Sequence, residues 1–172
     1  MKLNPTTEKF ILHWGEMGTK WGVNRTVAQI HALLYILDRP MNAEEITETL
    51  GVARSNVSNS IKELQNLRLV HTVHILGDRR DHFETSDDVW TLFRTIAEVR
   101  MQREIEPTRQ FLQSLIDSPE FSQENETAKQ RIQQTHDFIS TLTVWANEML
   151  KLSTSTMVKI LKIGAGIQKF FR

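Results

Sequence analysis

The stretch that decides the fold is residues 43–64, AEEITETLGVARSNVSNSIKEL. Asn42 stands three residues before Glu45, which is a capping-box pattern at the start of a helix, and Gly51 ends that helix after about two turns. The short turn Val52–Ala53 leads into a second helix. The stretch therefore predicts two helices joined by a tight turn.

The second of these helices has two chemically different faces. Val57, Ile61 and Leu64 form an apolar stripe at helical spacing. The remaining face carries small or forked hydrogen-bonding side chains, namely Arg54, Ser55, Asn56, Ser58, Asn59 and Lys62. In a major groove, Asn can pair with adenine and Arg with guanine through two hydrogen bonds each. These six residues are the candidate DNA contacts of the helix.

A hairpin is predicted directly after the two helices. Residues 69–76, LVHTVHIL, are rich in β-branched side chains and have no helical stripe, so they indicate a strand. Residues 77–81, GDRRD, form a polar turn, and residues 82–85 form a short returning strand. Arg79 and Arg80 at the tip could reach a minor groove or the phosphates. The order of elements is that of a winged helix-turn-helix with a two-stranded wing.

Several of these residues together resemble a known family. They are Ala43–Ile46, Gly51–Ser58, Ile61, Leu64, Leu69–Val70, Gly77–Asp81 and Phe83, with Trp14–Gly15, Gly18, Arg100–Pro107 and Gly164 outside the core. On them the chain is similar to the MarR superfamily of bacterial and archaeal transcription regulators, and within it to the GbsR-like branch, whose type member represses choline-to-glycine-betaine synthesis genes.

The resemblance implies a homodimeric, sequence-specific DNA-binding protein, a repressor that a small-molecule effector releases. It also implies that Asp78 pairs with Arg80 and orients it towards DNA, although a plain turn with exposed arginines would use the same residue types. One departure is visible: relatives commonly have Ser or Thr where Ala53 stands. Because Ala cannot accept the first amide bonds of a helix, this helix starts less stably or begins at Ser55.

The rest of the chain is predicted to be helical, so the fold class is mainly α. Asn4 and Pro5 begin a helix before the core, and Ser86–Asp88 begin a long one after it. We expect three parts: residues 1–23, an N-terminal dimerisation helix; residues 24–86, the winged helix-turn-helix; and residues 87–172, long C-terminal helices for dimerisation and an effector. Surplus apolar faces on the flanking helices predict a homodimer, and a two-fold protein predicts a pseudo-palindromic operator in double-stranded DNA.

The formal net charge of zero arises from cancellation between segments. Residues 1–53 carry a net charge of −1, residues 54–82 carry +2, residues 83–126 carry −6 and residues 127–172 carry +5. Phosphate contacts need cations, so the modest charge of the core leaves open an alternative function, a winged-helix adaptor that binds protein.

Other classes of function have little support in the sequence. The chain has no Cys, which removes thiolate chemistry, and it lacks nucleophile-elbow, phosphate-loop and His-Glu-x-x-His motifs, so we expect no catalytic residues and no cofactor. His71 and His74 point to opposite faces of a strand and cannot share an ion, so we expect no metal. The polar N-terminus lacks the apolar run of a signal peptide, which favours a cytoplasmic protein.

Two further interpretations concern aromatic residues and the tail. Trp14, Trp21, Tyr35 and Trp90 could form a cage for a quaternary ammonium effector such as choline or a betaine, although such residues more often serve packing. Residues 157–172 form an apolar helix with a narrow face of Lys159, Lys162, Gly166 and Lys169. This pattern fits a dimerisation helix, which we favour, or a basic helix on an anionic membrane. No membrane partner is expected.

Overall fold

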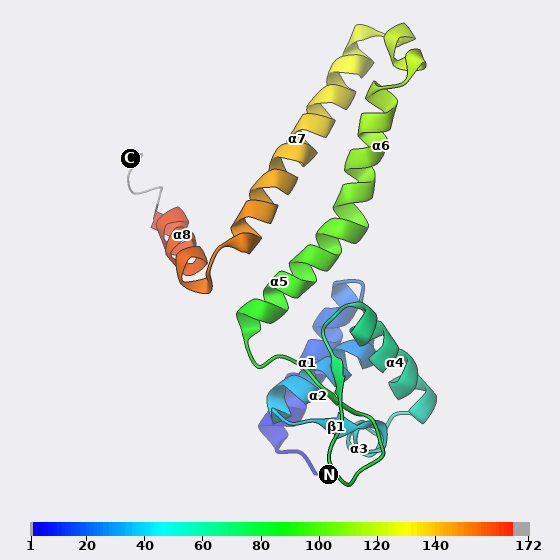
Figure 1. The fold of residues 1–172 in the computed structure, drawn as a ribbon, viewed down its shortest axis with the longest axis vertical. Helices are drawn as coiled ribbons and strands as arrows, with labels where there is room; N and C mark the ends of the chain where they lie inside the picture. Colours follow the sequence, from blue (N-terminus) through cyan, green and yellow to red (C-terminus); the bar gives the residue numbers. More distant parts are fainter. Residues whose placement is uncertain (1, 167–172) are drawn as a thin grey trace. The chain divides into compact units, whose positions relative to one another are not determined.

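The computed structural model describes residues 2–166 and is mainly helical (Figure 1). Its contacts divide the chain into two compact units, Met1–Ile96 and Ala97–Arg172. The last residues of the tail, including Ile167, Lys169, Phe170 and Phe171 of the predicted C-terminal helix, lie outside the described residues.

The first unit contains the predicted core and the helix that precedes it. Its elements are α1 (Pro5–Lys20), α2 (Arg25–Leu37), β1 (Met41–Asn42), α3 (Ala43–Leu50), α4 (Arg54–Asn66), β2 (His71–Val73), β3 (His82–Glu84) and the first part of α5 (Val89–Arg100). Asn4 caps α1 by accepting a bond from the Thr6 amide, and Asn24 caps α2 in the same way through Thr26. The helix start predicted at Asn4 is therefore confirmed.

A single apolar core holds these elements together. Side chains with almost no exposure come from α2, β1, α3 and α4, among them Ile30, Leu33, Met41, Ile46 and Leu64. Helix α1 lies against α2 at very short range, because a Cβ atom on Gly18 would be only 2.4 Å from the Cβ of Ala28. The glycine thus allows α1 to cover the core closely.

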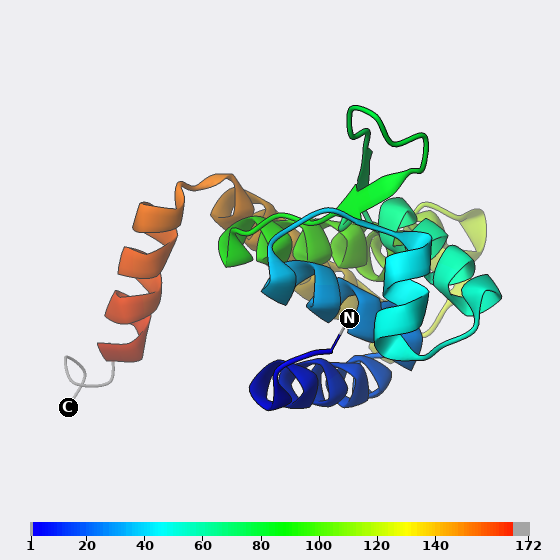
Figure 2. The same ribbon diagram turned by 90° about the horizontal axis from the view of Figure 1, so that it is seen from below.

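The sheet has one strand more than the sequence predicted. Its order is β1-β3-β2, antiparallel throughout, with Met41 opposite Phe83 and Asn42 opposite His82 in the first pair. Strands β2 and β3 are the predicted hairpin, although β2 covers only residues 71–73 of the expected 69–76. Figure 2 shows the turn between β2 and β3 projecting away from α4 and the sheet. The turn is therefore free to meet a partner.

The second unit is built on two long helices. After the rest of α5 come a π-helical segment (Met101–Ile105), α6 (Glu106–Ile116), a 3-10 turn (Pro119–Gln123), α7 (Glu126–Lys151) and α8 (Thr154–Gly166). Helices α6 and α7 pack side by side as an antiparallel pair (Figure 1). No helix within residues 2–166 is both long and apolar enough to cross a membrane.

The long helix that follows the core is irregular just before Pro107, where the π-helical segment lies. The amide of Glu106 donates to the carbonyl of Met101, five residues back, where an α-helix would bond four residues back. Pro107 itself has no amide hydrogen to donate to residue 103. The helix therefore widens by one residue just before the proline.

A buried histidine joins α2 to the end of the hairpin. His31 is 7% exposed, and its Nε2 lies 3.3 Å from Oγ1 of Thr85. That hydroxyl donates to the carbonyl of Leu69 at 2.7 Å, so it accepts from His31. Burial lowers the pKa of His31 to about 4. Between about pH 4 and 6.5, this imidazole is therefore mostly neutral in the folded protein and mostly protonated in the unfolded chain.

The free energy of unfolding is expected to fall as the pH drops from about 6.5 to about 4. In this window the unfolded state takes up a proton on His31 that the folded state does not, and the loss from this group reaches about 3 kcal/mol. Urea titrations at several pH values measure it, with His31→Gln as the variant that lacks the titration. Identical pH slopes for the variant and the wild-type protein would contradict the assignment.

Candidate nucleic-acid interface

The first helix of the motif is fixed by its two ends. The Oδ1 of Asn42 accepts bonds from the amides of Glu44 and Glu45 at 3.0 Å each, and Oε2 of Glu45 accepts one from the Asn42 amide at 3.0 Å. Gly51 ends α3 in the left-handed conformation, with φ 63°, and its amide donates to the carbonyl of Thr47. The predicted capping box and glycine stop are both confirmed.

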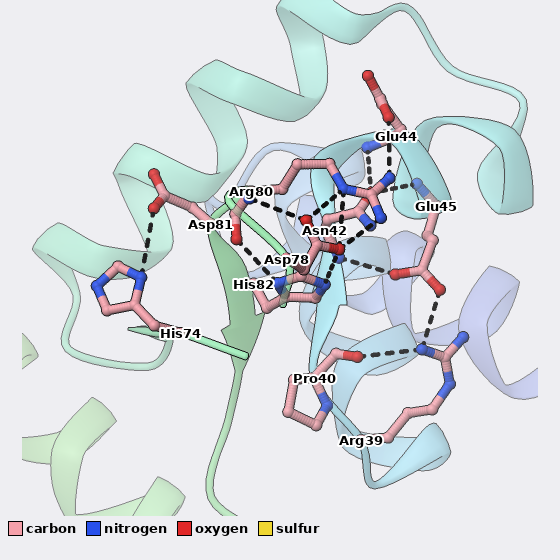
Figure 3. Close-up of polar contacts among 10 residues, drawn as sticks. All are labelled: Arg39, Pro40, Asn42, Glu44, Glu45, His74, Asp78, Arg80, Asp81 and His82. Atoms are coloured by element: carbon pink, nitrogen blue, oxygen red, sulfur yellow. Dashed lines mark hydrogen bonds and ion pairs between the residues drawn. The ribbon is translucent and has the colours of Figure 1, made fainter. Parts of the chain in front are cut away.

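Ion pairing adds to the capping box. Burial raises the pKa of Glu45, but the Asn42 amide and the nearby Arg39 guanidinium outweigh it, so the pKa is lowered overall. The Nη1 atom of Arg39 lies 3.1 Å from Oε1 of Glu45 (Figure 3). The start of α3 is therefore held by a charged carboxylate.

Helix α4 exposes the predicted polar residues. It begins at Arg54 after Ala53, which supplies no side-chain cap, as the departure at this position predicts. Val57, Ser60, Ile61 and Leu64 are buried. The six candidate residues are all exposed: Arg54, Ser55, Asn56, Ser58, Asn59 and Lys62. The helix therefore offers an uninterrupted row of hydrogen-bonding groups to a partner.

The tip of the wing contains a tight turn. The amide of Asp78 donates to the carbonyl of Ile75 at 3.0 Å, and Gly77 has φ 87°. A positive φ at the third position of a four-residue turn is best met by glycine. The turn leads directly into Arg79 and Arg80, which are both exposed.

Asp78 holds Arg80 in one orientation. The Nε atom of Arg80 donates to Oδ1 of Asp78 at 2.9 Å, and Nη2 donates to Oδ2 at 2.5 Å (Figure 3). The backbone amide of Arg80 also donates to Oδ1 at 3.0 Å. Arg80 keeps the pKa of the Asp78 carboxyl far below its usual range, and Asp78 raises the pKa of Arg80. The pair expected from the family resemblance is present.

A further contact links the wing to both helices of the motif. The Oε2 atom of Glu44 lies 3.3 Å from Nη1 of Arg80, and Oε1 lies 3.5 Å from Nη1 of Arg54. The sequence analysis missed this role of Glu44. No local signal points to it, because Glu44 comes close to Arg80 only when β1 pairs with β3 and brings the start of α3 beside the wing.

Two candidate cations differ from Arg54 and Arg80. Within residues 2–166, neither the side chain of Lys62 nor that of Arg79 forms a hydrogen bond or an ion pair. Their charges are not compensated by a contacting carboxylate of the described chain. They are therefore the candidate residues best placed to exchange counterions for phosphate.

The histidines of the wing pair with carboxylates. The Nε2 atom of His71 is 2.8 Å from Oε1 of Glu84, its partner across the strands, and Nδ1 of His74 is 3.9 Å from Oδ1 of Asp81. Among residues 2–166 no group of three or more His, Cys, Asp or Glu side chains could hold a metal ion.

The four aromatic residues proposed as an effector cage fall into separate groups. Trp14 meets Trp21 edge-on, with ring centroids 5.8 Å apart, and stacks on Phe10. Trp90 contacts Phe93 of its own helix, and Tyr35 packs at the border of the core. The structure thus brings together Trp14 and Trp21. The cage as a whole stays a prediction.

The comparisons with known proteins agree with this geometry. The chain is similar to the putative HTH-type transcriptional regulator YvaV of Bacillus subtilis (strain 168), with 25% identity over 52% of this chain and 50% of the relative. It is also similar to the HTH-type transcriptional repressor GbsR of the same organism, with 26% identity over 50% of this chain and 47% of the relative. The chain spans about half the length of these curated relatives.

A solved structure supports the fold. A crystal structure of a transcriptional regulator superimposes with a TM-score of 0.66 at 17% identity, over 85% of this chain and 96% of the other. Residues 21–81, which span α2 to the wing tip, match the model of the MarR family. The winged helix-turn-helix segment of the chain is therefore similar to the MarR family.

Proposed function

We propose that this protein is a sequence-specific DNA-binding transcription regulator that acts as a homodimeric repressor. The observation that carries the proposal is the exposed row of hydrogen-bonding side chains on α4, next to a projecting wing with two arginines. A regulator of transcription acts where the chromosome lies, so the proposal includes a cytoplasmic location.

The proposed contacts differ in what they recognise. Helix α4 enters the major groove, where Ser55, Asn56 and Asn59 meet base edges. Lys62 and Arg79 bind phosphates, which gives affinity without sequence preference. Arg80 is oriented by Asp78 towards the minor groove or the backbone, and Arg54 and Ser58 border the α4 contact.

Footprinting on the DNA that flanks the protein's own gene, followed by selection from random duplexes, tests the function. The expected result is protection of an approximate inverted repeat with its two halves about 34 Å apart along the duplex. Absence of protection and of any selected sequence at moderate salt would favour the protein-binding adaptor.

Replacing one wing cation and one helix residue should have different effects. Arg79→Ala is expected to weaken binding to all sequences alike and to reduce the salt slope by about one, whereas Asn59→Ala should cost about 1 to 3 kcal/mol at one base position. Lys20→Ala, which removes a positive charge at the end of α1, is the matched control. Binding measured by fluorescence anisotropy across salt concentrations checks this, and equal losses at every base for both variants would contradict the assignment.

The proposed dimer is supported by apolar side chains that the single chain leaves exposed. Phe138, Leu142 and Trp145 follow one another at spacings of four and three on α7 and are 64%, 47% and 61% exposed. Further exposed apolar residues of the second unit are Ile105, Phe111, Val144, Ile160, Leu161 and Ile163. Soluble proteins seldom leave such a stripe in water, and a second copy with the same stripe would cover it.

A charge in this stripe should separate the dimer. Phe138→Glu is expected to shift the protein to a monomer in sedimentation experiments and to weaken operator binding, because a monomer has contacts with one half-site only. Asn147→Glu introduces the same charge at an exposed polar position on the opposite face of α7 and should leave the dimer intact. If Phe138→Glu forms a dimer of unchanged stability, the dimer interface lies elsewhere on the chain.

The proposal includes an effector, a quaternary ammonium compound such as choline or a betaine, as the family resemblance implies. Such a ligand releases DNA only if it binds one spacing of the two α4 helices better than the other. Calorimetric titration of choline and of glycine betaine into the free and the operator-bound protein is expected to give unequal affinities. Absence of binding to either form would remove these ligands and leave the repressor function standing.

A further inference from the structure

Glu44 is placed unusually for an acidic residue beside a DNA-binding surface. It belongs to the first turn of α3, yet its two carboxylate oxygens lie near arginines of two other elements, 3.5 Å from Arg54 of α4 and 3.3 Å from Arg80 of the wing. Figure 3 shows the contact with Arg80 beside the Asp78 pair. One carboxylate thus lies between two of the residues proposed to approach DNA.

The arrangement neutralises the arginines that it connects. Arg80 uses Nε and Nη2 on Asp78 and Nη1 on Glu44, so each of its three nitrogens already has a carboxylate partner. Two acids and two arginines give this group a formal charge of zero. The uncompensated cations beside it are Arg79 and Lys62, within the described residues.

The contacts of Glu44 are poorly suited to holding the wing in place. They are long, and the side chains are exposed, at 49% for Glu44, 54% for Arg80 and 74% for Arg54. Exposed ion pairs of this kind contribute little to rigidity or stability. The shorter contact of Arg80 with Asp78, which is 23% exposed, and the β1–β3 pairing already fix the wing.

Resting on the proposed DNA-binding function, we propose that Glu44 is an intramolecular competitor of DNA phosphate. Its carboxylate occupies Arg54 and Arg80 in the free protein, and a phosphate that reaches both arginines must approach the same negative charge. Binding to any duplex therefore includes the cost of separating these pairs and of bringing like charges together. Glu44 thereby limits the part of the affinity that does not depend on sequence.

Glu44→Gln is the direct test, with Glu48→Gln as the matched control. Glu48 lies one turn further along α3 and is exposed, and its side chain forms no hydrogen bond or ion pair within the described residues. A labelled duplex of mixed sequence and about 30 base pairs is titrated with the full chain at several salt concentrations. We expect Glu44→Gln to bind roughly fivefold more tightly than the wild-type protein, with a steeper salt slope, and Glu48→Gln to change much less.

A coupling measurement ties the gain to the two arginines. The same Glu44→Gln change in an Arg54→Ala, Arg80→Ala background should lose most of its effect, since the arginines that it releases are absent. Urea midpoints of all variants show that each is folded. A gain that persists undiminished in this background would overturn the proposed competition.

Each of the other possible results also supports or contradicts the competition between Glu44 and DNA phosphate. If Glu44→Gln binds more weakly than the wild-type protein, or no differently from Glu48→Gln, the inference is wrong while the DNA-binding function stands. If only Glu44→Gln binds, the competition is supported in its strongest form. If no folded variant binds any duplex at the lowest salt, the proposed function fails and the inference fails with it.

Discussion

The pairing of β1 with β3 is the constraint on which the rest of the proposed DNA-binding surface depends. It consists of two residue pairs, Met41 with Phe83 and Asn42 with His82. Asn42 ends the strand and at the same time caps α3, so the sheet and the helix-turn-helix share one residue. Because Met41 and Phe83 are also part of the core, the base of the wing cannot shift without disturbing both.

The same register determines where the charges of the wing lie. Pairing of Asn42 with His82 brings the first turn of α3, which contains Glu44, close to Arg80, two residues before His82. The Nδ1 atom of His82 lies 3.0 Å from the carbonyl of Arg80, and because a carbonyl only accepts, the imidazole donates. The β1–β3 pairing, the buried His82 and the Asp78 carboxylate therefore all constrain the position of Arg80. Its orientation is set before any DNA is present.

Local signals predicted most of the first unit and missed what depends on distant partners. Asn42, Gly51 and the stripe of Val57, Ile61 and Leu64 act within a few residues, and the structure has the elements that they predicted. Strand β1 is only two residues long, too short for a periodic pattern, and its partner lies about 40 residues further on. The position of Glu44 follows from that pairing, so the sequence alone did not reveal it. The functions of the exposed residues on α4 stay predictions.

The zero net charge of the whole chain has a local counterpart at the proposed DNA-binding surface. The net charges of segments that lie far apart in the sequence cancel one another. At the candidate interface itself, the carboxylates of Glu44 and Asp78 neutralise Arg54 and Arg80. Among the candidate contacts, this leaves the charges of Lys62 and Arg79 without a carboxylate partner in the part of the chain that the structure describes. A surface with so few free cations gains little from counterion release. In the proposed regulator the affinity for an operator must therefore come mainly from the base contacts of α4, repeated on the two half-sites of a dimer.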